Sequence, residues 1–161
     1  MLKPAFDTVN KSRPIPSEPD DPRGRPSSDY ESASELPRGG RVLVAEDEYF
    51  AALMLEAALT DAGIDVVGLA HTAADAVQLA RLQRPDLVVM DIRLRGRRDG
   101  VEAALEIFEA TGIRCIFATA HSDPLTKARA QVAEPIGWVA KPYLTRALVA
   151  VVRSALREIS D

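Results

Sequence analysis

Acidic side chains follow two apolar runs of this chain at the point where each run ends. Leu87–Met90 is followed directly by Asp91, and Val42–Ala45 is followed by Glu46 and Asp47. Short apolar runs rich in β-branched residues are typical of strands that are buried on both faces. In open α/β sheets, ligands bind at the edge formed by the carboxyl ends of the strands. We therefore expect the three carboxylates to meet at that edge.

Carboxylates held close together repel one another, which raises their pKa values unless a cation joins them. A hard divalent ion with oxygen ligands is the natural companion, so Glu46, Asp47 and Asp91 predict a Mg²⁺ site that could also take Mn²⁺. Each acid also has a plainer interpretation. Asp91 could simply cap a helix, and Glu46 and Asp47 could be first-turn acids that the helix dipole favours.

Strand and helix patterns alternate without a break from Arg41 onward. The expected strands cover residues 41–46, 65–70, 86–91, 113–119 and 136–140. The expected helices cover residues 48–62, 72–82, 101–110, 123–132 and 144–159. Because crossovers between parallel strands are right-handed, five βα units predict an α/β fold: a flavodoxin-like, doubly wound, five-stranded parallel sheet of order 2-1-3-4-5 with five helices.

Several local signals support these helices. Thr72 and Asp123 are candidate N-caps, and Pro124 suits the first position of a helix. Helical spacing predicts the apolar face of each helix. For residues 48–62 that face would comprise Phe50, Leu53, Met54, Ala57 and Ala58, and for residues 144–159 it would comprise Leu148, Val149, Val152 and Leu156.

Composition narrows the function classes. A net charge of −4 and a pI of about 5.3 do not favour nucleic acid or an anionic membrane as partner. The arginines of the RLRGRRDG stretch are the local exception, and we interpret them as a solvated loop. The single cysteine, Cys115, lies in an apolar run and is predicted to be a core residue, which fits a reducing cytosol. Without a signal peptide or a long apolar span, the expected location is cytoplasmic.

The first 38 residues differ from the rest, since they hold seven of the eleven prolines. Such a composition buries too little apolar surface to order itself, so residues 1–38 are predicted to be a disordered tail and residues 39–161 the folded domain. No output domain is expected after the last helix, which predicts a stand-alone domain.

Two further strand ends carry polar groups, Thr119 within FATAH and Lys141 before Pro142. With Glu46-Asp47 and Asp91, their order and spacing resemble the receiver domain of response regulators in two-component signalling. The resemblance spans Arg41 to Asp161, and Phe117-Ala118-Thr119 resembles the subgroup with a Phe-Ala-Thr motif.

The resemblance implies a role for each position. Asp91 would be the phosphoacceptor of a sensor histidine kinase or histidine phosphotransferase. Glu46, Asp47, Asp91 and the backbone carbonyl of Arg93 would hold Mg²⁺. Further positions would bind the phosphoryl group or switch with it: Thr119, Ala120, Lys141 and Trp138. A cis bond would precede Pro142.

The implied output is a phosphorylation-dependent change in the face formed by the fourth helix, the fifth strand and the fifth helix, read by an unknown protein partner. The domain would be a monomer or a phosphorylation-dependent dimer. Taken alone, Thr119 could be an ordinary strand residue, Lys141 a surface lysine and Trp138 a core residue. His71 and His121 are not expected to be phosphorylated.

This sequence departs from the family in two places. The acid pair is Glu-Asp where many receivers have Asp-Asp, and the loop after Asp91 is longer and basic. A small phosphohydrolase with an aspartate nucleophile is the alternative function, but such enzymes usually carry an aspartate where this chain has Arg93. A phosphorylation-independent binding module is a third interpretation, against which the intact acids, Thr119 and Lys141 argue.

Overall fold

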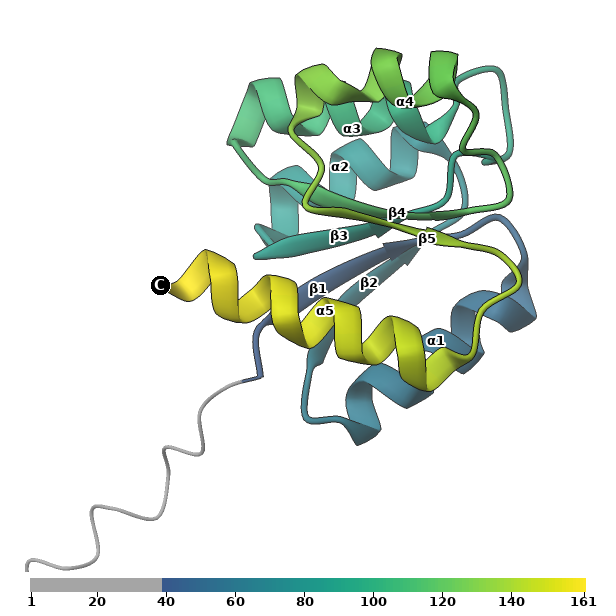
Figure 1. Cartoon of the computed structure of the whole chain (residues 1–161). Helices are drawn as coiled ribbons and strands as arrows, with labels where there is room; N and C mark the ends of the chain where they lie inside the picture. The colour runs from purple at the N-terminus through teal and green to yellow at the C-terminus, as the bar shows by residue number, and fades with distance from the viewer. Residues whose placement is uncertain (1–38) are drawn as a thin grey trace, which may run out of the picture. The chain divides into compact units, whose positions relative to one another are not determined.

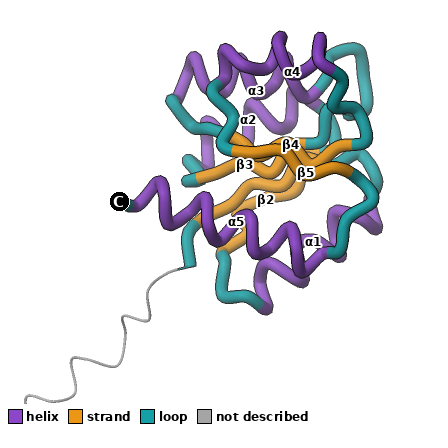
Figure 2. The backbone as a smooth tube through the Cα atoms, viewed as in Figure 1, coloured by secondary structure: helices purple, strands orange, loops and turns teal. Residues whose placement is uncertain are grey.

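The computed structural model describes residues 39–161, so the tail predicted for residues 1–38 lies outside the described residues. The strands are β1 (Arg41–Ala45), β2 (Asp65–Ala70), β3 (Leu87–Met90), β4 (Cys115–Thr119) and β5 (Gly137–Ala140). The helices are α1 (Tyr49–Asp61), α2 (Ala73–Gln83), α3 (Gly100–Thr111), α4 (Pro124–Ala130), a 3₁₀ turn (Gln131–Ala133) and α5 (Thr145–Ser160). Strands and helices alternate along the chain, as predicted (Figures 1 and 2).

The five strands form one sheet of order β2-β1-β3-β4-β5, and all four strand pairs are parallel. This confirms the predicted flavodoxin-like topology. The chain moves outward in one direction from β1 to β2 and in the other from β3 to β5. The reversal lies between β1 and β3, where Ala45 pairs with Met90.

Helices cover both faces of the sheet, with α1 and α5 on one side and α2, α3 and α4 on the other (Figure 1). Successive side chains of a strand point to opposite faces of the sheet, so each strand contributes to the apolar layers on both faces. Val42 and Val44 pack with residues of α1 and α5, whereas Leu43 and Ala45 pack with residues of α2 and α3. Because both faces are covered, β3 is apolar throughout and β1 is apolar after its first residue, Arg41.

The predicted caps at Thr72 and Asp123 are confirmed. The Thr72 hydroxyl accepts from the Asp75 N–H, and the Asp123 carboxylate accepts from the N–H groups of Leu125 and Thr126. Two predicted boundaries were wrong by two residues. Strand β4 begins at Cys115 rather than at residue 113. Helix α4 ends at Ala130 rather than at residue 132, because the chain tightens into the 3₁₀ turn.

The predicted apolar face of α1 was wrong. The residues that α1 buries are Ala52, Leu55 and Leu59, whereas Phe50 and Met54 are 72% and 65% exposed. Apolar residues occur on every side of this helix, so spacing alone did not identify the face that contacts the sheet. For α5 the prediction was closer, since Leu148, Val152 and Leu156 are buried and Val149 is half-buried. Within residues 39–161, no helix combines the length and apolarity needed to cross a membrane.

Candidate functional site

The acidic residues lie at the switch point of the sheet. Beyond the strands, the Asp91 N–H donates to the Ala45 carbonyl at 2.9 Å, and the Glu46 N–H donates to the Ala70 carbonyl at 2.9 Å. These bonds continue the ladder by one residue on each strand. Asp91 and Glu46 are therefore held beside each other where β3 and β1 end.

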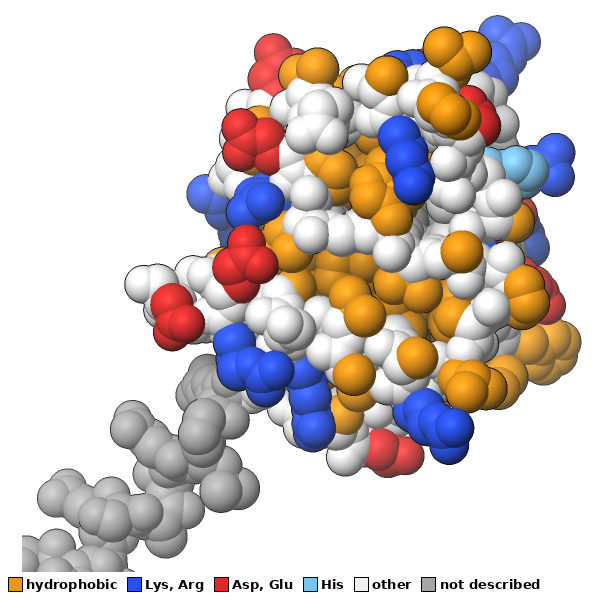
Figure 3. Space-filling model, viewed as in Figure 1, with side chains coloured by type: hydrophobic (Ala, Val, Ile, Leu, Met, Phe, Trp, Pro, Cys, Tyr) orange, Lys and Arg blue, Asp and Glu red, His pale blue; other side chains and the backbone are white. Residues whose placement is uncertain are grey.

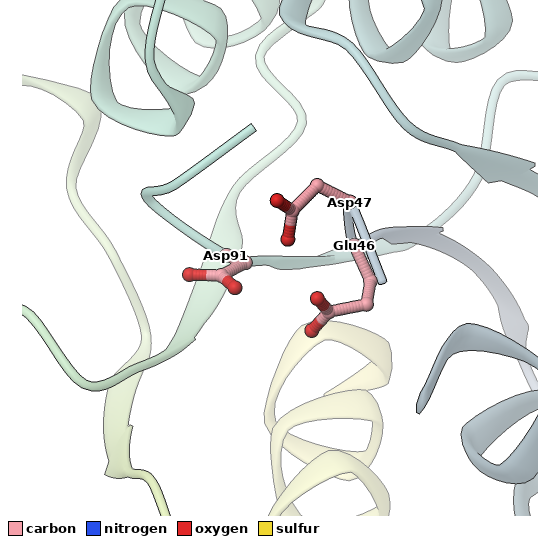
Figure 4. Close-up of side chains that lie close together, drawn as sticks. All are labelled: Glu46, Asp47 and Asp91. Atoms are coloured by element: carbon pink, nitrogen blue, oxygen red, sulfur yellow. The ribbon is translucent and has the colours of Figure 1, made fainter. Parts of the chain in front are cut away.

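The three acids meet as the sequence predicted. Carboxylate oxygens of Glu46, Asp47 and Asp91 lie within 4.8 Å of one another, and Figure 4 shows the three groups converging on one region. Glu46 and Asp91 are only 5% and 6% exposed. Within the described residues, the buried polar or charged side chains are Glu46, Asp91 and Thr119. The buried polarity of this domain thus gathers at the carboxyl edge.

Lys141 enters the same cluster from the end of β5. Its Nζ donates to Glu46 Oε2 at 2.6 Å and to Asp91 Oδ2 at 2.7 Å. Burial by itself would lower the pKa of Lys141, but the hydrogen bonds and charges of Asp91 and Glu46 outweigh it and raise that pKa. Burial also raises the pKa of Glu46, against the opposing hydrogen bond from Lys141. Lys141 therefore stays cationic and balances part of the acidic charge.

The loop after Asp91 folds back tightly. The Arg93 N–H donates to Asp91 Oδ1 at 3.2 Å, and the Gly100 N–H donates to the Ile92 carbonyl at 2.7 Å. A Cβ at Gly100 would lie 2.0 Å from the Asp91 carbonyl oxygen, so only glycine fits there. The predicted role of the Arg93 carbonyl as a metal ligand remains a prediction.

Thr119 and Ala120 stand at the end of β4, next to the strand that carries Asp91. Thr119 is buried and its hydroxyl accepts from the His121 N–H at 3.1 Å, whereas Ala120 is exposed. The Lys141 N–H donates to the Thr119 carbonyl at 3.0 Å, which links the ends of β4 and β5. The Lys141–Pro142 peptide bond is cis.

Trp138 lies in β5, on the face of the sheet covered by α4. It is half-buried and stacks on Phe117, with ring centroids 4.5 Å apart. Lys127 of α4 places its Nζ 5.5 Å from the Trp138 ring centroid. Trp138 thus connects β4 and β5 to α4.

One residue at this edge was not predicted from the sequence. The Nδ1 of His71 lies 2.7 Å from the Glu46 carbonyl oxygen. The available signal was position, since His71 directly follows β2 as Glu46 follows β1.

The donor set fits a hard divalent cation. It consists of carboxylate oxygens alone, three acids face one ammonium, and burial already raises the pKa of Glu46. Glu46, Asp47 and Asp91 are the residues that would hold Mg²⁺ or Mn²⁺, which prefer such oxygen ligands.

This sheet order and this acidic cluster define a class, the CheY-like α/β domains with a flavodoxin fold. The chain belongs to the family described as the response regulator receiver domain, whose model matches residues 42–153. It is therefore the receiver domain of a two-component response regulator, and a receiver implies a kinase partner.

Relatives agree with this assignment. The chain is 36% identical over 136 residues to the transcriptional regulatory protein PdtaR of Mycobacterium tuberculosis, covering 84% of this chain and 64% of PdtaR. It is 34% identical over 117 residues to the phyllosphere-induced regulator PhyR of Methylorubrum extorquens, covering 71% of this chain and 43% of PhyR. The chain thus spans less than two thirds of these relatives.

Among solved structures, the signal receiver domain of a modulated diguanylate cyclase from Desulfovibrio desulfuricans is similar, with a TM-score of 0.68 and 34% identity. The match covers 75% of this chain and 96% of that domain.

Proposed function

We propose that Asp91 is the phosphoacceptor of this receiver domain, phosphorylated by a sensor histidine kinase or a histidine phosphotransferase. The observation that supports this most is the buried Asp91 carboxylate, 2.7 Å from the Lys141 ammonium and grouped with the oxygens of Glu46 and Asp47. A carboxylate in that setting is a positioned nucleophile with a cation beside it.

In the proposed reaction, one carboxylate oxygen of Asp91 attacks the phosphorus of a phosphohistidine. The new bond is an acyl phosphate, the phosphorus–nitrogen bond breaks, and the imidazole leaves with the electron pair and takes up a proton. Mg²⁺, held by Glu46, Asp47, Asp91 and the Arg93 carbonyl, would offset the charge of the phosphoryl group. Lys141 supplies a compact positive charge to a phosphoryl oxygen, and its raised pKa keeps it protonated.

The surface beside the acids suits a protein as phosphodonor. Large apolar side chains of α1 are exposed there, with Tyr49 54% and Phe50 72% exposed. A groove of about 430 Å³ lies next to them, lined by Met54, Leu55, Lys141 and Tyr143 among others. Exposed apolar patches next to a polar site commonly mark protein contacts, so this surface supports docking of a phosphodonor protein.

Thr119, Ala120 and Trp138 are proposed to carry the signal from Asp91 to the face formed by α4, β5 and α5. Thr119 would leave the His121 N–H to bind a phosphoryl oxygen. Trp138, which contacts Phe117 and Lys127, would then change its packing under α4. Figure 3 shows apolar side chains gathered on this face, between α4 and α5. Its exposed large apolar residues include Leu125, Leu144 and Val151, and a cytoplasmic protein partner would read their rearrangement.

The test is labelling with acetyl phosphate and Mg²⁺, comparing wild type with Asp91→Asn and Asp86→Asn. Asp86 is the matched control, because it is exposed and precedes the same strand at the opposite edge. We expect base-labile labelling in wild type and Asp86→Asn, none in Asp91→Asn, and none with EDTA. An adduct of the same stability in Asp91→Asn would overturn the assignment.

A further inference from the structure

His71 is bonded to the peptide unit that joins two of the acids. Its Nδ1 lies 2.7 Å from the Glu46 carbonyl oxygen, which can only accept, so Nδ1 carries the hydrogen. That carbonyl belongs to the peptide linking Glu46 to Asp47. The bond therefore fixes the plane from which the Asp47 side chain departs.

The backbone amide of Glu46 is also hydrogen-bonded to the end of β2. The Glu46 N–H donates to the carbonyl of Ala70, the residue before His71. Consecutive residues at the end of β2 thus restrain both the amide and the carbonyl of Glu46. The ring of Tyr49, in the first turn of α1, lies beside the His71 ring, with centroids 6.1 Å apart.

The main chain of His71 also contacts the arginine-rich loop that follows Asp91. Its carbonyl accepts from the Arg95 N–H at 3.0 Å, and Thr72 forms an isolated parallel bridge with Arg95. Arg95 lies two residues beyond Arg93, in the loop that leaves Asp91. One residue therefore ties the loop carrying Glu46 and Asp47 to the loop carrying Asp91.

We propose that His71 is a positioning residue for the divalent-cation site: its ring hydrogen bond holds the Glu46–Asp47 peptide so that the acids are preorganised. This rests on the proposed metal role of Glu46, Asp47 and Asp91. Without the bond, the peptide can rotate, and cation binding must reorder it. Changes in groups that orient metal ligands typically weaken metal affinity by about 10-fold or more.

The chain offers variants that separate this role from a general structural one. In His71→Asn, the amide nitrogen is as many bonds from Cα as Nδ1 is, so the bond to the Glu46 carbonyl is kept. His71→Gln puts its nitrogen one bond further, and His71→Ala has none. His121→Ala is the matched control, because the exposed His121 contacts Thr119 only through its backbone N–H.

The experiment measures Mn²⁺ binding to the full chain by the EPR signal of the free ion, with Mg²⁺ as competitor. Urea unfolding without metal verifies that each variant folds. We expect His71→Ala and His71→Gln to bind Mn²⁺ about 10-fold more weakly, and His71→Asn and His121→Ala to bind within about 2-fold of wild type. Saturating Mg²⁺ should restore acetyl phosphate labelling in His71→Ala.

Wild-type affinity in His71→Ala would overturn the positioning role alone. Equal weakening in His71→Asn and His71→Ala would overturn the hydrogen bond as its cause. A wild-type chain that binds no Mn²⁺ or Mg²⁺ would overturn the metal site itself, and this inference with it.

Discussion

Both edges of the sheet carry charged groups, but the pairing and the burial of these groups differ between the two edges. At the amino edge, the Arg41 guanidinium donates to the carbonyls of Gln83 and Arg84 and lies 3.7 Å from Asp65, whose side chain is 69% exposed. At the carboxyl edge, Lys141 bonds to Glu46 and Asp91, whose side chains are 6% and 7% exposed.

The difference lies in charge balance and burial. Arg41 meets carbonyl oxygens and water, so its charge costs little and its ion pair contributes little. The carboxyl edge holds three acids and one ammonium, and two of the three acids are buried. This excess of buried negative charge is unfavourable without a further cation. Charge at the amino edge is therefore paired and partly exposed, whereas the carboxyl edge carries an excess of buried negative charge.

The largest effect is expected from Gly100→Ala, which tests how tightly the carboxyl edge is built. The new Cβ would meet backbone atoms of Asp91 and Ile92 at 2.0 to 2.9 Å, so β3 and α3 must separate. We expect a loss of about 2 kcal/mol or more in the free energy of unfolding, measured by urea denaturation.

Gly137→Ala is the control for Gly100→Ala, because a Cβ there meets nothing within 4 Å. It should change the free energy of unfolding by less than about 0.5 kcal/mol. Equal losses in both variants would contradict the crowding at Asp91.

Lys141→Met removes the cation that balances the buried acids. Without metal at pH 7.5, we expect a loss of about 1–3 kcal/mol in the free energy of unfolding. Burial raises the folded-state pKa of Glu46, and loss of Lys141 raises it further. When an acid has a raised pKa in the folded state, the protein loses stability as the pH rises through that pKa. The loss of unfolding free energy in Lys141→Met should therefore be smaller at pH 5 than at pH 7.5.

Urea unfolding at both pH values measures the Lys141 effect, with Arg146→Met as an exposed control. A penalty that grows on acidification would show that Lys141 does not compensate buried carboxylates.

The equivalent change at the amino edge is Arg41→Met. Because its partners are carbonyls and an exposed acid, the expected loss is only about 0.5–1 kcal/mol. This loss in the free energy of unfolding, measured by urea denaturation as for Lys141→Met, should not depend on pH between 5 and 7.5. A loss as large as that of Lys141→Met would remove the contrast between the edges.

The smallest effect concerns Cys115, the buried first residue of β4. Burial raises the pKa of this thiol to about 12, so almost no thiolate forms at pH 8. We expect no reaction with DTNB in the native protein and one thiol per chain in urea. Rapid native labelling would mean that β4 opens readily.

Much of the fold and site could be predicted because the signals are local. Apolar runs ending in Asp91 and Glu46 located the strand ends, and alternation with helices made the sheet parallel, so the acids had to meet. The face of α1 could not be predicted, because its apolar residues surround the helix and packing on the sheet selected Ala52, Leu55 and Leu59.

The sequence by itself determined which side chains stand at the carboxyl edge, since strand periodicity and crossover handedness leave one arrangement. Only the tertiary structure decided what those side chains bond to. Lys141 reaches Glu46 across 95 positions of the chain, and His71 reaches the Glu46 carbonyl across 25. Such contacts depend on the spacing between distant strands and on side-chain rotation, which no local pattern encodes.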